Sequence, residues 1–162
     1  MVTLSSASIT YTLTNTPCGA PTSVSFTSVV KPGGSLTVSW SGATAGTNNS
    51  ISGYDVYYKI GSAPTTSSYD GSASVSSTST SASTSFTISS SASRGSAFYA
   101  MVRTKGSAGS SYYSGWKSGN GGVVNSLPGA PTVTVDKTRI RSDGTATTIN
   151  FTVTAGSDNN TS

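Results

Sequence analysis

The sequence contains no histidine and no glutamate, and its five acidic residues are all aspartates. Without histidine, neither a Ser-His-Asp nor a Cys-His catalytic arrangement can form, and a zinc site of the usual His/Cys type is excluded. Two carboxylates could still perform acid/base chemistry, but these aspartates fall mostly in turns or on strand edges. They are Asp55, Asp70, Asp136, Asp143 and Asp158. We therefore expect no enzyme, no catalytic residues, no metal site and no cofactor.

Cysteine and long apolar runs are also scarce. Cys18 is the single cysteine, so an intrachain disulfide is excluded, and its position beside Pro17 in a linker predicts an inert thiol. No apolar run approaches the roughly 20 residues of a membrane span. The first residues have no basic group and no long apolar stretch of the kind found in secretory signals. We expect no membrane insertion and, if Met1 is the natural start, no export by the ordinary signal route.

Charge is low as well, at 9% charged residues and a net charge of +4. The one basic group, Lys137, Arg139 and Arg141, alternates along the chain and would share one face of an extended segment. Such charges commonly protect the edge of a sheet from unwanted pairing. We therefore expect no nucleic-acid partner.

Serine and threonine make up more than a third of the chain, a bias that disordered segments and glycosylated stalks share. However, Val, Ile, Phe and Tyr alternate with polar residues in short runs, which is the pattern of β-strands. Threonine itself favours strands. The sequence therefore predicts an all-β protein, with residues 72–85 as its least certain part.

A repeat organises the chain. Gly19-Ala20-Pro21-Thr22 recurs 110 residues later as Gly129-Ala130-Pro131-Thr132. The first copy continues to Trp40 and Gly46-Thr47-Asn48-Asn49, and the second to Phe151 and Gly156-Ser157-Asp158-Asn159. A repeat of this length fits one β-sandwich and its linker. We predict an orphan strand and linker in residues 1–18, a complete module in 19–127, and two strands of a second module in 128–162.

Within residues 19–127, apolar alternation predicts about seven strands in an antiparallel two-sheet sandwich. The clearest strands hold Leu36-x-Val38-x-Trp40, residues 51–58 and Phe98-x-Ala100-x-Val102. In order and spacing, these motifs and Pro21 resemble the fibronectin type III family, and the resemblance implies that family's sandwich. The chain departs from the family in having Phe98 where a tyrosine usually braces a corner, and in lacking a Leu-x-Pro-Gly turn after Ile88.

Both ends leave apolar strand faces without an obvious cover. At the N-terminal end these are Ile9, Tyr11 and Leu13, and at the C-terminal end Ile149, Phe151 and Val153. One hypothesis joins them: subunits associate head to tail, and strand addition completes a sandwich. The alternative is that they are the cut ends of a longer repeat protein.

The loop of residues 105–120 is a candidate contact surface for a ligand or a subunit. It carries Tyr112, Tyr113 and Trp116 among glycines and serines, and such aromatics give rigid contact area. They could stack on sugar rings or pack against a neighbouring subunit. Alternatively, Trp116 caps the end of the sandwich and Tyr113 lies on a sheet.

Tandem modules of this kind, low in charge, rich in Ser, Thr and Gly and without a secretory signal, resemble the modules of bacteriophage structural proteins, which reach the outside by lysis and need no export peptide. This resemblance implies a non-enzymatic structural or adhesive module of a virion, such as a tail, fibre or capsid-decorating protein. Its partners would be copies of itself or other virion proteins, with a cell-surface glycan as a further candidate. Two alternatives remain open. One is a fragment of a secreted bacterial surface protein, or a spacer in a polysaccharide-degrading enzyme, at an extracellular or cell-surface location. The other is a self-assembling filament subunit.

Overall fold

The structure, a computed structural model, describes residues 9–125, 128–136 and 149–156. Among these residues there is no α-helix, and the all-β prediction is confirmed. The elements are ten strands and one 3-10 turn: β1 (Ser23–Phe26), β2 (Val29–Val30), β3 (Ser35–Ser41), β4 (Ile51–Ile60), β5 (Gly71–Val75), β6 (Ala82–Thr87), β7 (Ala97–Gly106), η1 (Ser110–Tyr112), β8 (Lys117–Val124), β9 (Thr132–Val135) and β10 (Phe151–Thr154).

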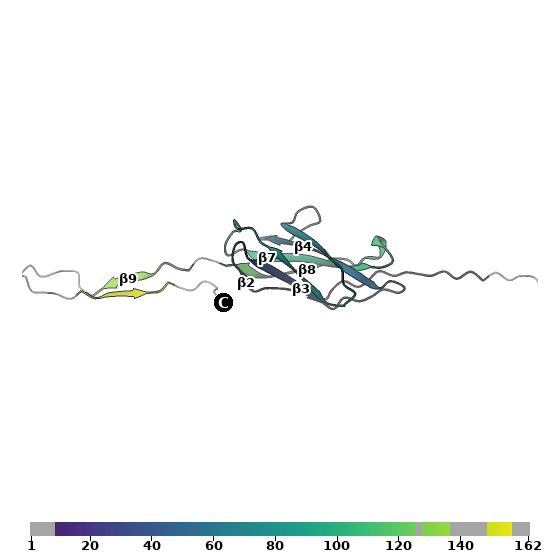
Figure 1. Cartoon of the computed structure of the whole chain (residues 1–162), viewed down its shortest axis with the longest axis horizontal. Helices are drawn as coiled ribbons and strands as arrows, with labels where there is room; N and C mark the ends of the chain where they lie inside the picture. Colours follow the sequence, from purple (N-terminus) through teal and green to yellow (C-terminus); the bar gives the residue numbers. More distant parts are fainter. Residues whose placement is uncertain (1–8, 126–127, 137–148, 157–162) are drawn as a thin grey trace, which may run out of the picture.

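The strands form three sheets (Figure 1). One has the order β1-β3-β6, the second the order β2-β8-β7-β4-β5, and the third is the hairpin β9-β10. The two larger sheets differ from the predicted antiparallel, seven-stranded arrangement in two respects. Strand β2 pairs with β8 in parallel, and the Ser-rich stretch contributes a further strand, β5, on the edge beside β4.

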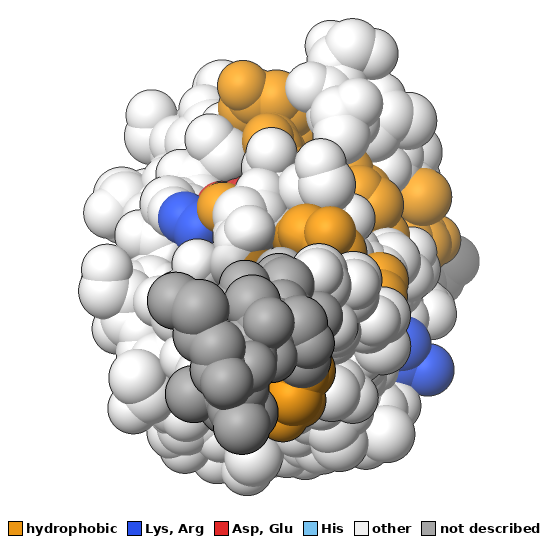
Figure 2. Space-filling view, turned by 90° about the vertical axis from the view of Figure 1, so that its right-hand side faces the viewer, with side chains coloured by type: hydrophobic (Ala, Val, Ile, Leu, Met, Phe, Trp, Pro, Cys, Tyr) orange, Lys and Arg blue, Asp and Glu red, His pale blue; other side chains and the backbone are white. Residues whose placement is uncertain are grey.

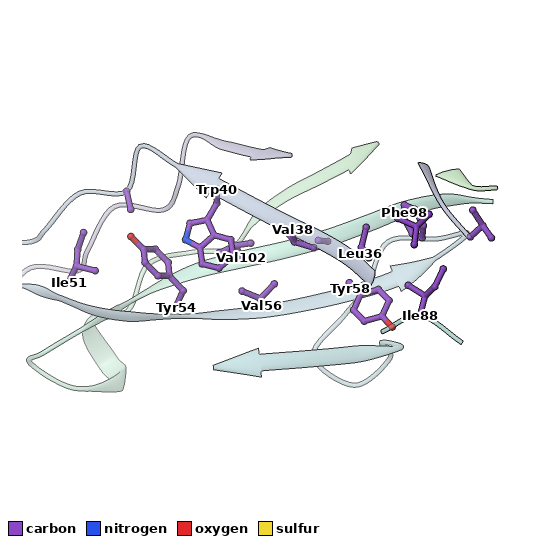
Figure 3. Packing of buried hydrophobic residues seen from close by; sticks show 14 residues of the cluster. Leu36, Val38, Trp40, Ile51, Tyr54, Val56, Tyr58, Ile88, Phe98 and Val102 are labelled. Carbon is purple, nitrogen blue, oxygen red and sulfur yellow. The ribbon is translucent and has the colours of Figure 1, made fainter. Parts of the chain in front are cut away.

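The two larger sheets share one hydrophobic core, because each turns the apolar side of its alternating strands towards the other. In β3, the buried positions are Leu36, Val38 and Trp40. Figure 3 shows these side chains directed at residues of the facing sheet, among them Tyr54 and Val56. The predicted alternation of β3 and β4 is therefore confirmed.

Aromatic contacts span the core. The ring centroids of Trp40 and Tyr54 lie 5.1 Å apart, and those of Tyr58 and Phe86 lie 4.6 Å apart. The hydroxyl of Tyr54 donates a hydrogen bond of 2.5 Å to the carbonyl of Ser79, which ties the Ser-rich stretch to the sheet. Burial raises the pKa of both Tyr54 and Tyr58 above the ordinary tyrosine value. Phe98, the departure from the family pattern, is fully buried.

The hairpin β9-β10 is antiparallel, like the pair β1-β3, and it also pairs apolar residues with each other. In the first pair, Val24 faces Trp40 and Phe26 faces Val38. In the hairpin, Val133 faces Val153 and Val135 faces Phe151. Counted from the two Gly-Ala-Pro-Thr segments, Val24 corresponds to Thr134, which pairs with Thr152, so the apolar residues of the hairpin are shifted by one position relative to those of β1. All four hairpin residues are exposed, by 45% to 66%.

Because Val38 is buried and Val153 is exposed, replacing each by alanine should change the free energy of unfolding by different amounts. Val38→Ala, at a position with 0% exposure, should lower the free energy of unfolding by about 2 kcal/mol, through lost transfer energy and a cavity. Val153→Ala, at 65% exposure, should change it by less than about 0.5 kcal/mol. Urea unfolding of dilute protein, followed by tryptophan fluorescence, measures both. Equal losses would contradict the exposure of the hairpin.

Candidate functional site

The three aromatic residues predicted as contact candidates do not form a single surface. Tyr113 and Trp116 lie beside Arg103 on the outer face of the five-stranded sheet. Tyr112 belongs to η1, and its backbone carbonyl accepts hydrogen bonds from Cys18 and Asn49. The loop thus contributes to two separate features, a row of side chains on the sheet and a contact with the N-terminal linker.

Arg103 is the centre of the first feature. Its guanidinium carbon lies 4.7 Å from the ring centroid of Trp116 and 5.1 Å from that of Tyr113. Its Nε and Nη2 atoms lie 2.9 and 2.8 Å from the same carboxylate oxygen of Asp55. Lys105 approaches the other oxygen at 3.7 Å. The ion pair fixes the plane of the guanidinium, so that it can stack on the aromatic rings.

The row continues across the sheet through edge-on aromatic contacts. Trp116 meets Tyr57 at 5.3 Å, and Tyr57 meets Tyr69 at 4.7 Å between ring centroids. Tyr69 ends the row with 44% of its surface exposed. We call Tyr113, Arg103, Trp116, Tyr57 and Tyr69 the Arg103 row.

Strand register explains why these residues meet. Asp55 is paired with Arg103 across β4 and β7, and Tyr57 is paired with Met101. Because the alternate residues of both strands fill the core, these four side chains point outwards. Met101 is nevertheless 7% exposed, which shows that the outer face is partly covered. Chemically, the row is an aromatic and cationic surface.

The second feature is an anchored linker, formed where residues 14–19 meet residues 44–49 and Tyr112. The side chain of Asn49 is buried and hydrogen-bonds to Thr16, Tyr112 and Ala108. Cys18 is a free, buried thiol in this contact. The sequence predicts only an ordinary linker here; the Asn48-Asn49 pair in the repeat is the one signal that points to Asn49.

Apart from Ile149, which is half-buried, the apolar residues predicted at the two ends are exposed. Ile9, Tyr11 and Leu13 are 73%, 85% and 81% exposed, and the predicted strand does not form there. Phe151 and Val153 lie in β10, and Ile149 lies just before it. No described segment brings the two groups together.

Two of the described aspartates hydrogen-bond to nearby strands. Asp70 accepts a hydrogen bond from the backbone of Ile60, and Asp136 accepts two from Asn150. Within residues 9–125, 128–136 and 149–156, no three His, Cys, Asp or Glu side chains cluster in a way that could hold a metal ion. No helix in that part of the chain is long and apolar enough to cross a membrane. Lys137, Arg139, Arg141, Asp143 and Asp158 lie outside it.

One end of the molecule is mostly uncharged. Figure 2 shows one end of the molecule, where uncharged polar side chains and backbone dominate and apolar side chains form separate patches.

Comparison of the chain with protein-family models and with curated proteins finds no match.

The Arg103 row predicts that arginine geometry, and not charge alone, holds Trp116. Arg103→Lys keeps the charge but loses the planar stacking and the double contact with Asp55. We expect the free energy of unfolding to fall by about 1 kcal/mol, and acrylamide quenching of tryptophan fluorescence to increase. Trp40, which is 2% exposed, contributes little to this quenching.

The matched control for this experiment is Arg94→Lys, because the one side-chain bond of exposed Arg94 within the described residues goes to the backbone carbonyl of Asn125. The control should leave both quantities unchanged. If Arg103→Lys behaves like the control, the stacking does not contribute to the position of Trp116.

Proposed function

We propose that this chain is a non-enzymatic structural module of fibronectin type III-like fold, which acts as a spacer or attachment unit within a virion. The main support is the repeated Gly-Ala-Pro-Thr segment, each copy of which leads into a pair of antiparallel strands. Modules that begin identically and follow one another along a chain suit a protein that spans distance.

The strand order supports the fold part of the proposal. Strands β1-β3-β6 face β8-β7-β4-β5, and β2 is added at the β8 edge. Two sheets of three and four strands, packed over alternating inward residues, match the sandwich that fibronectin type III domains share with immunoglobulin domains. On this assignment, residues 19–127 are one module and residues 128–162 begin another.

The surface chemistry supports the spacer role. Neighbouring strands present hydroxyl groups to solvent, and these bond to each other, as between Ser23 and Ser41 at 2.7 Å and between Thr37 and Ser85 at 3.0 Å. With few charges, such a surface depends little on pH or salt. The virion assignment follows the resemblance to tandem modules of bacteriophage structural proteins. As an attachment unit, the module would offer the Arg103 row to a partner protein or a glycan.

Immunogold labelling tests the virion assignment. With an antibody raised against this chain, we expect gold label on virus particles that are purified from a culture in which the chain is naturally produced. The control is labelling of cell envelopes and of particle-free culture medium from the same preparation. Label confined to envelopes or medium would instead favour the secreted surface protein or enzyme spacer.

A second candidate, the self-assembling subunit, is favoured by the exposed apolar residues at both ends. The paired residues of β9 and β10 form a ribbon with valine and phenylalanine on one side and threonine on the other, and an isolated two-stranded ribbon is marginal in water. If a second copy covers it, sedimentation should show association that increases with concentration.

The variant for this candidate is Phe151→Ser with Val153→Ser, which should return the chain to a monomer. The matched control, Thr152→Ser with Thr154→Ser, alters the other side of the same strand and should still associate. A monomeric wild-type chain at high concentration would rule out self-assembly.

A further inference from the structure

We infer that residues 14–19 form a rigid joint, which fixes the direction in which the chain enters the module. The joint is a specific contact surface for an extended segment of the chain's own linker, built from residues 44–49 and the carbonyl of Tyr112. The joint deepens the proposed spacer function. Its contacts exist whatever the module is used for, and only the use of the joint as a spacer element rests on the proposed function.

The side chain of Asn49 makes the central contact. Its Nδ2 donates hydrogen bonds of 2.9 Å to the carbonyls of both Thr16 and Tyr112. Its Oδ1 accepts one of 2.9 Å from the backbone N–H of Ala108. Asn49 is 2% exposed, so water cannot replace these partners. A single buried amide therefore joins the linker to the loop after β7.

The two residues before Asn49 bind the linker as well. The backbone N–H of Thr47 donates to Oγ1 of Thr16 at 2.6 Å, and the N–H of Thr16 donates to the carbonyl of Thr47 at 3.1 Å. The side chain of Asn48 donates to the carbonyl of Thr14 at 3.2 Å. Asn48 has a φ of 49°, a left-handed conformation that asparagine adopts more readily than most residues. Three consecutive loop residues thus contact the linker.

The end of the linker nearest the module core, Cys18 and Gly19, is also held by hydrogen bonds. Cys18 is 4% exposed, and its N–H donates to the carbonyl of Tyr112 at 3.1 Å. Gly19 donates to the carbonyl of Thr44 at 2.9 Å, and the hydroxyl of Thr104 in β7 donates to the carbonyl of Gly19 at 2.9 Å. Pro17 further restricts its own backbone and that of Thr16. The anchored stretch is therefore continuous from Thr14 to Gly19.

Two glycines leave the space that the joint needs. A Cβ atom at Gly46 would collide with the carbonyl oxygen of Thr16, and one at Gly106 would collide with the amide of Asn49. Gly46 does not have a positive φ, so its backbone favours no left-handed conformation, and the three atoms nearest to an added Cβ all belong to the linker. This makes Gly46→Ala a variant that pushes the linker away while leaving the core intact.

Nuclear magnetic resonance of the full chain tests the joint. In the wild-type protein, the backbone order parameters of Asn15 and Thr16 should be near 0.85, as in rigid backbone, and the amides of Thr16 and Cys18 should be protected from hydrogen exchange. In Gly46→Ala, the order parameters should fall below about 0.6, and the exchange rate of the Thr16 amide should rise about tenfold or more. Amides of β3, β4 and β7 should keep their protection.

The matched control is Gly115→Ala, because a Cβ atom at Gly115 meets no atom within 4 Å. It should leave the linker as ordered as in the wild type. Unprotected Thr16 and Cys18 amides in the wild-type protein, or no change in Gly46→Ala, would overturn the joint. Neither result bears on where the protein is found, and a failure of the immunogold test would leave the joint standing.

Discussion

The packing of the two larger sheets against each other is the interaction on which the other features depend. Trp40 of one sheet contacts Tyr54 of the other, and both are buried. Because side chains alternate along a strand, a shift of one residue would turn every buried side chain outwards. Fixing Tyr54 inside therefore fixes Asp55 outside, where it holds Arg103. The outer row is thus a consequence of the core.

The sequence predicts those parts of the fold in which apolar residues alternate, as in β3, β4 and β7. It does not predict β5, because Gly71–Val75 is rich in small residues and gives almost no alternating signal. The parallel pairing of Val29 with Val123 is equally hidden, because backbone hydrogen bonds create it and side-chain type does not record them.

The candidate sites show the same division. The sequence indicates Tyr113 and Trp116 by their type, but their partner Arg103 becomes visible only when β4 and β7 are placed in register. Tyr112 acts through its carbonyl oxygen, which every residue possesses, so its side chain gives no indication of that role. Asn49 binds mainly backbone groups, and a pattern of residue types cannot identify such partners.

The hairpin β9-β10 and the pair β1-β3 show that strand pairing does not by itself bury apolar side chains. Strands β9-β10 and β1-β3 both pair antiparallel with apolar residues facing each other, yet Val38 and Trp40 are buried while Phe151 and Val153 are exposed. Local sequence therefore specifies the ribbon, and burial under a second sheet supplies most of the free energy. A chain with only 9% charged residues has little long-range electrostatic force to orient its parts. Order between neighbouring segments must then come from short-range contacts, and the buried amide of Asn49 is one that acts on the linker itself.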